Sequence, residues 1–142
     1  MSGREYPDRP RVGVGAIVIR KGRVLLVQRG IEPSRGLWAI PGGSLELGET
    51  IQEGAEREIL EETGIVIRAG DPVHTFDFFE RDQAGRIRFH YVIVDVTAEY
   101  VSGDVRADDD AADARWLSPK DLDALPVARN TLRVLQKVGF LP

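Results

Sequence analysis

The sequence contains no cysteine among its 142 residues. Disulfides and thiolate metal sites are therefore excluded, and a cytoplasmic location fits this composition. No apolar run approaches the roughly 18 residues that a membrane-spanning helix requires. The first segment, residues 1–11, is polar and lacks the apolar stretch of a secretory signal, so we expect a flexible N-terminal arm. These absences predict a cytoplasmic protein without a membrane partner.

The sequence also lacks an excess of positive charge. It contains 19 lysines and arginines and 23 acidic residues, which gives a net charge of -4. Binding a nucleic-acid polymer requires a clustered basic face, so this balance argues against such a partner. A small phosphorylated ligand remains compatible, since a divalent metal can neutralise both the ligand and an acidic site. Length and a 42% hydrophobic fraction predict one globular domain, residues 1–142.

The hydrophobic pattern alternates between strands and helices. Apolar runs predict strands at 12–19, 24–28, 37–40, 73–79, 87–96 and 114–117. The clearest helix is predicted over 50–63, where Thr50 and Glu53 have the spacing of a capping box and Gly64 is placed to end the helix. A short helix from Ser118 and a C-terminal helix over 127–138 complete the pattern. Together these elements predict an α/β fold with helices packed on a mixed sheet.

Three glutamates on the predicted helix form a candidate metal site. A helix turns about 100° per residue, so Glu58, Glu61 and Glu62 fall within an arc of roughly 100°. Their like charges repel one another, and their oxygens are hard ligands suited to Mg²⁺ or Mn²⁺. A glutamate-rich helix face is usually only solvated, and this alternative applies to any isolated motif of this kind.

Residues before and within the helix extend this pattern. Arg57 is placed to pair with Glu61 one turn later or with Glu49 in the preceding loop, and either pair would orient a ligand carboxylate. Gly42 and Gly43 permit an unusual backbone path, in which a carbonyl becomes a further oxygen ligand.

The whole stretch from Gly43 to Ile65 resembles a complete Nudix box: Gly, five residues, Glu, seven residues, then Arg-Glu-aliphatic-any-Glu-Glu-any-Gly-aliphatic. The resemblance implies the Nudix fold, an α/β/α sandwich around a mixed sheet, and Mg²⁺- or Mn²⁺-dependent hydrolysis of a nucleoside diphosphate linked to another group. It also implies metal ligands, namely Glu58, Glu61, Glu62 and the Gly42 carbonyl, with Arg57 in the catalytic set.

The family often adds an acidic residue from a later loop as ligand or general base. The run Asp108–Asp110 is the natural source, and we expect Asp110 to fill this role. The alternative is that these three aspartates form a solvated loop, in which case Glu80 and Glu99 are the next candidates.

Substrate contacts are expected outside the box. Arginines suit phosphates and aromatic rings suit a base, and the candidates are Arg29, Arg35, Trp38, Phe79, Arg81 and His90. Other aromatic residues of the same two strands, Phe76, Phe78, Phe89 and Tyr91, are more often core residues than base contacts.

The segment from Asp108 to Trp116 resembles ADP-ribose pyrophosphatase-like members, which favours ADP-ribose or a nucleotide sugar as the small-molecule substrate. Two alternatives stay open: a nucleoside triphosphate pyrophosphohydrolase, and a non-catalytic nucleotide-binding module. Homodimers are common in the family, and the sequence leaves the oligomeric state open.

Overall fold

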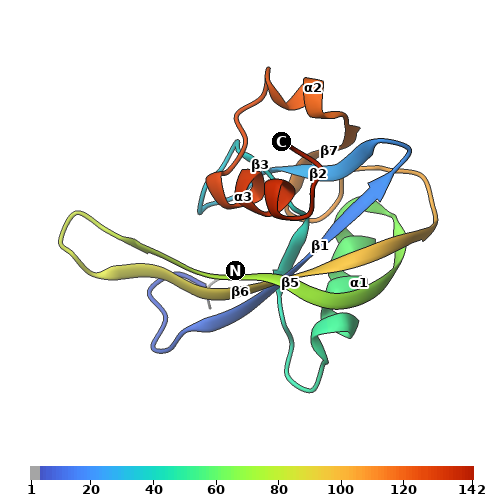
Figure 1. Ribbon diagram of the computed structural model, residues 1–142. Helices are drawn as coiled ribbons and strands as arrows, with labels where there is room; N and C mark the ends of the chain where they lie inside the picture. The colour runs from blue at the N-terminus through green and yellow to red at the C-terminus, as the bar shows by residue number, and fades with distance from the viewer. Residues whose placement is uncertain (1–3) are drawn as a thin grey trace.

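A computed structural model describes residues 4–142 and shows a mixed sheet with helices on both faces (Figure 1). Its strands are β1 (Arg11–Arg20), β2 (Arg23–Arg29), β3 (Trp38–Ala39), β4 (Gly42–Ser44), β5 (Val66–Arg81), β6 (Ile87–Ser102) and β7 (Ala111–Leu117). Its helices are α1 (Ile51–Thr63), α2 (Pro119–Leu122) and α3 (Arg129–Lys137).

Strand β1 lies at the centre of the sheet. It pairs in parallel with β6 and antiparallel with β2 and β4, while β5 pairs with the far side of β6. The strand order β3-β2-β1-β6-β5 places β5 at an edge, and β7 pairs with β2. The expected mixed sheet is thus confirmed.

Two apolar cores, one on each face of the sheet, confirm the α/β/α sandwich. The first lies under α1 and includes Ala16, Val18, Ala55 and Ile59. The second gathers side chains of the sheet and of the C-terminal helices, among them Ile17, Trp38, Leu122, Val134 and Leu135. Burying this apolar surface on both faces holds the sheet between the helices.

Helix α1 begins and ends as its sequence predicts. The Thr50 side chain accepts from the Glu53 backbone N–H at 3.0 Å, and the Glu53 carboxylate accepts from the Thr50 N–H at 2.8 Å. Gly64 ends the helix with φ 76°, a left-handed conformation that favours glycine. Both ends of the helix are therefore fixed, and this determines the direction in which its glutamates point.

The long hairpin of β5 and β6 differs from the sequence prediction in length, since each strand has 16 residues. Gly70-Asp71-Pro72 has the composition of a turn, yet β5 continues through it with shifts in register on both sides of Pro72. Because β5 is an edge strand, proline can be accommodated there without breaking the sheet. The hairpin extends well beyond the helices (Figure 1).

The described part of the N-terminal segment lies against this hairpin. The Tyr6 backbone N–H donates to the Arg88 carbonyl at 2.7 Å, and the Tyr6 hydroxyl donates to Asp82 at 3.0 Å. Arg11, which the sequence analysis assigned to the arm, is instead the first residue of β1; residues 1–3 lie outside the described part. None of the described helices is long and apolar enough to span a membrane.

Candidate active site

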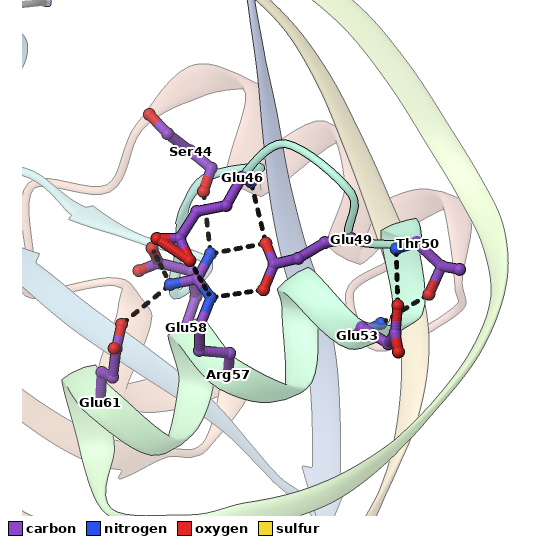
Figure 2. A network of polar contacts seen from close by, with 8 residues as sticks. All are labelled: Ser44, Glu46, Glu49, Thr50, Glu53, Arg57, Glu58 and Glu61. Carbon is purple, nitrogen blue, oxygen red and sulfur yellow. Dashed lines mark hydrogen bonds and ion pairs between the residues drawn. The ribbon is translucent and has the colours of Figure 1, made fainter.

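Arg57 on α1 is the centre of a network of polar contacts (Figure 2). Its guanidinium donates to both oxygens of Glu49, at 2.6 and 2.9 Å, and to the Ser44 carbonyl at 3.0 Å. It also contacts Glu58 and Glu61, each at 2.9 Å. Both pairs that the sequence left as alternatives, with Glu49 and with Glu61, therefore form together. The loop before α1 is tied to the helix, and two glutamates are held in place.

Carboxylates from two separate elements meet on the exposed side of α1. Oxygens of Glu58, Glu61 and Asp109 lie within 4.8 Å of one another. Three hard oxygen donors at this separation suit a divalent cation of the magnesium type. The cluster therefore contains two of the glutamates that the sequence motif predicts as ligands, Glu58 and Glu61, together with a loop aspartate. Glu62 and the Gly42 carbonyl are not part of it and stay predicted ligands.

The loop that carries Asp109 is hydrogen-bonded to the end of α1. The Arg106 N–H donates to the Thr63 carbonyl at 2.9 Å, and the Asp108 N–H donates to the Glu62 carbonyl at 3.0 Å. These carbonyls belong to the last turn of the helix, where no further intrahelical donor exists. The end of α1 thus serves as the anchor that brings Asp109 to the cluster.

Glu62 lies deeper than the other helix carboxylates, with 6% of its surface exposed. Its Oε1 accepts from the Gly42 backbone N–H at 3.1 Å. Burial raises the pKa of Glu62 to about 8, despite the lowering effect of the Gly42 N–H. Burial likewise raises the pKa of Glu58, against the lowering effect of Arg57. Without a cation the site disfavours these charges, so a bound cation would supply the missing compensation.

Gly42 and Gly43 belong to a short strand, whereas the sequence predicts a strand that ends at residue 40 and an unusual backbone path at these two glycines. Strand β4 pairs with β1 through Gly42 opposite Gly15 and Gly43 opposite Val14. A Cβ atom on Gly42 would overlap the Val14 carbonyl, and one on Gly43 would overlap the Glu58 carboxylate. The two glycines are therefore required by close approach to β1 and to a helix glutamate. The Gly42 carbonyl remains a predicted ligand.

Among the predicted substrate contacts, Arg29 lies nearest to the acidic residues. Its charge interacts with those of Glu62 and Asp110, and partial burial lowers its pKa. Its Nε donates to the Pro33 carbonyl at 2.6 Å, which fixes the guanidinium at the end of β2. An oriented arginine beside a cation site is suited to hold a phosphate.

The sequence favoured Asp110, but the structure brings its neighbour Asp109 to Glu58 and Glu61. Asp110 lies 3.6 Å from Arg4 and interacts with the charge of Glu62. Asp109 has a positive φ of 53°. The sequence shows the run of aspartates but not which of them reaches the helix glutamates. That choice depends on the tertiary hydrogen bonds between this loop and the end of α1.

The other predicted substrate residues are not brought to this cluster. Trp38 is 3% exposed and packs in the second core, so its ring supports the fold. Phe79 and His90 pair edge to face on the β5–β6 hairpin, and Arg81 donates to the Gly85 carbonyl at the hairpin tip. Arg35 is exposed in the loop before β3. For these residues a substrate role depends on how far a ligand extends from the acidic cluster.

Fold and site together define an α/β domain in which one helix carries a cluster of acidic side chains suited to a divalent cation. The NUDIX domain family matches residues 9–138, and the chain belongs to the Nudix hydrolase family. It is 35% identical over 117 residues to an ADP-ribose pyrophosphatase of Methanocaldococcus jannaschii. That alignment covers 82% of this chain but only 65% of the relative's length.

Solved structures show the same fold. A MutT Nudix hydrolase from Burkholderia pseudomallei superimposes with a TM-score of 0.78 at 32% identity, covering 92% of this chain and 99% of that one. The Nudix domain of Shewanella oneidensis NrtR, solved in complex with ADP ribose, has a TM-score of 0.71 at 25% identity, covering 92% and 87%. The family members that resemble this chain thus include one named as an ADP-ribose pyrophosphatase and one solved with bound ADP ribose.

Proposed function

We propose that this protein hydrolyses the diphosphate linkage of a nucleoside diphosphate derivative, with ADP-ribose as the favoured substrate and Mg²⁺ or Mn²⁺ as cofactor. The observation that carries the proposal is the meeting of Glu58, Glu61 and Asp109 within 4.8 Å, beside the buried Glu62. The similarity to an ADP-ribose pyrophosphatase supports the choice of substrate.

The residues that would hold the cation are Glu58, Glu61 and Asp109, which the structure brings together, with the predicted ligands Glu62 and the Gly42 carbonyl. When bound, a divalent cation neutralises charge on the phosphates and lowers the pKa of the attacking water. Arg57 positions Glu58 and Glu61 through its 2.9 Å contacts, while its bidentate pair with Glu49 fixes the guanidinium itself. Arg29 is placed to bind a phosphate oxygen.

The reaction is a direct displacement by water. The water oxygen forms a bond to one phosphorus, the anhydride P–O bond breaks, and the second phosphate leaves. A carboxylate of the Asp108–Asp110 loop accepts the proton of the water, since a carboxylate outside the cation's ligand set keeps its basicity. With ADP-ribose the products are AMP and ribose 5-phosphate. Asp110 fits this role, because it lies outside the cluster of Glu58, Glu61 and Asp109 while its charge acts on Glu62.

The proposal extends to the setting of the protein. A single catalytic domain, a cytoplasmic location and a small nucleotide as partner all fit the composition, and neither a nucleic-acid polymer nor a membrane is required. A homodimer remains a prediction from the family resemblance.

The test is a hydrolysis assay with ADP-ribose, a nucleotide sugar and a nucleoside triphosphate, each with Mg²⁺ and with excess chelator. We expect turnover that chelation abolishes and that added Mg²⁺ restores, with the highest kcat/KM for ADP-ribose. Full activity in chelator would refute the cation-dependent mechanism. A kcat/KM about tenfold higher for the triphosphate than for ADP-ribose corresponds to about 1.4 kcal/mol in transition-state binding. This result would contradict ADP-ribose as the favoured substrate and indicate a nucleoside triphosphate instead.

A further inference from the structure

A buried aspartate without a partner lies on the opposite face of the sheet from α1. Asp95 of β6 is 4% exposed, and burial alone raises its pKa to about 7. No hydrogen bond or ion pair to its carboxylate occurs within the part of the chain that the structure describes. A buried carboxyl group without a partner costs stability. Folding stability therefore does not explain why an aspartate occupies this position.

Neighbouring strands place Asp95 in a row of polar and small residues. In register, Asp95 lies between Gly15 of β1 and His74 of β5, and Gly15 in turn lies opposite Gly42 of β4. A Cβ atom on Gly15 would come within 2.6 Å of an Asp95 carboxylate oxygen, so glycine at this position makes room for the carboxylate. The His74 Nε2 is buried and also lacks a hydrogen-bond partner. Two polar groups with unused hydrogen-bonding capacity therefore adjoin.

The same face continues along β5 and β6 from this pair towards the position of Arg29. Side chains alternate across a strand, so Tyr91 and Ile93 lie on the face of Asp95, with Phe78 and Phe76 opposite them on β5. We call Phe76, Phe78, Tyr91 and Ile93 the aromatic face. Phe76, Phe78 and Ile93 are partly exposed. At its far end, Tyr91 interacts with Arg29, which interacts with Glu62.

The aromatic face thus has Arg29 near its Tyr91 end and the Asp95 carboxylate at its other end. Asp95 follows Tyr91 by four positions along β6, which is about 13 Å of strand. This length accommodates a nucleoside whose phosphates lie at Arg29 and the acidic cluster. Rings of the face offer stacking contacts, while Asp95 offers an acceptor for one hydrogen-bond donor.

We propose that Asp95 is a specificity-determining residue, which accepts a hydrogen bond from a donor group of the nucleoside part of the substrate. The donor is a sugar hydroxyl or the exocyclic amine of the base, which share this chemistry. The inference rests on the proposed function, since it assigns the substrate's phosphates to the acidic cluster. It gives the buried carboxylate the partner that the protein itself does not provide.

The experiment compares wild-type protein with Asp95→Asn and Asp95→Val, assayed with Mg²⁺ about one pH unit above the Asp95 pKa. Substrates are ADP-ribose, IDP-ribose, which lacks the exocyclic amine, and an analogue with 2′-deoxyadenosine. We expect wild-type kcat/KM to fall about 10- to 100-fold for the analogue without the bound donor, as for loss of a hydrogen bond to a charged group. Asp95→Val should lose this discrimination, whereas Asp95→Asn, whose amide oxygen still accepts a hydrogen bond, should retain part of it. The change is expected in KM, with kcat retained.

A matched control is Asp77→Asn, an exposed aspartate of the neighbouring strand β5, which should leave discrimination and KM unchanged. The melting temperature without substrate should stay level or rise in both Asp95 variants, since an unpaired buried charge is removed. A marked loss of stability, or unchanged discrimination and KM in an active Asp95→Val enzyme, would overturn the inference and leave the proposed function standing. Absence of hydrolysis by wild-type protein would instead refute the proposed function.

Discussion

Arg57 and Glu49 form a bidentate ion pair, with Nε and Nη2 of the guanidinium donating to the two oxygens of one carboxylate at 2.6 and 2.9 Å (Figure 2). The pair joins the loop before α1 to the helix, eight residues apart in sequence. Two charged donors on one carboxylate lower the pKa of Glu49 and hold it ionised. With Nε and Nη2 held by Glu49, the remaining nitrogen Nη1 contacts Glu58 and Glu61.

The first prediction concerns Arg57→Lys. An ammonium group cannot reproduce the planar bidentate contact, so Glu58 and Glu61 should lose their common orientation. We expect kcat, or the affinity for Mg²⁺, to fall about 10- to 100-fold, the usual effect of removing a group that orients metal ligands. Steady-state kinetics and a Mg²⁺ titration measure it. Arg68→Lys is the control, because Arg68 pairs with Glu99 on the exposed surface; equal effects of the two substitutions would contradict the positioning role.

The second prediction separates function from stability at Glu62 and Glu61. Glu62→Gln keeps an oxygen for the Gly42 N–H but removes a buried carboxyl group whose ionisation the site disfavours. Turnover should fall by orders of magnitude, while the melting temperature of the metal-free protein rises. Glu61→Gln should also reduce turnover but leave the metal-free melting temperature nearly unchanged, since the Glu61 side chain is 48% exposed. Unaltered turnover with a large loss of stability would show that these residues are structural.

How far the sequence predicts this fold depends on whether the signal is local. The capping box of Thr50 and Glu53 and the ending at Gly64 are local, and the structure confirms them. The strand formed by Gly42 and Gly43 has no local signal, because glycine weakens strands in general. Glycine is required at these two positions by close contacts with Val14 and Glu58, which are distant in the sequence.

Candidate site residues divide in the same way. The spacing of Glu58, Glu61 and Glu62 places them on one helix face without reference to the rest of the chain. The partner from the later loop depends on hydrogen bonds to the end of α1, and these bring Asp109, rather than Asp110, to Glu58 and Glu61. Asp95 gave no signal in the sequence, since an aspartate in an apolar strand becomes informative only when its burial and lack of partners are known.

The third prediction compares the two aspartates of the loop. Asp109 lies with Glu58 and Glu61, whereas Asp110 lies beside Arg4 and interacts with Glu62. We expect Asp109→Asn to weaken Mg²⁺ binding, so that its loss of turnover is rescued by excess Mg²⁺. Asp110→Asn should lower kcat without rescue if Asp110 takes the proton of the water. Rates across pH at saturating Mg²⁺ measure both.

The double variant removes the ambiguity that a neighbour replaces the missing carboxylate. Asp109→Asn combined with Asp110→Asn should lose more turnover than either single variant. If the double variant keeps wild-type turnover at every pH, the proton acceptor lies outside this loop, and Glu80 and Glu99 become the candidates. Asp104→Asn, an exposed residue earlier in the same connection, serves as the control for an effect of charge alone.

The fourth prediction concerns the pH dependence of stability at Asp95. Burial raises its pKa to about 7 in the folded protein, against about 3.9 in an unfolded chain. The folded state therefore holds this proton more tightly. The resulting contribution to stability is complete below about pH 4 and is lost as the pH rises through about 7.

Asp95→Asn removes this titration while keeping the size of the side chain. The variant should therefore gain stability relative to wild type as the pH rises from about 5 to 8, with a ceiling of about 4 kcal/mol for a shift of three pKa units. Denaturant unfolding at a series of pH values, with chelator present throughout, measures the difference in the free energy of unfolding. Asp77→Asn should show no such trend, because Asp77 is exposed on the neighbouring strand. A difference between Asp95→Asn and wild type that stays constant across this range would mean that the Asp95 carboxyl titrates as it does in the unfolded chain, and that its burial is relieved by a contact within the protein.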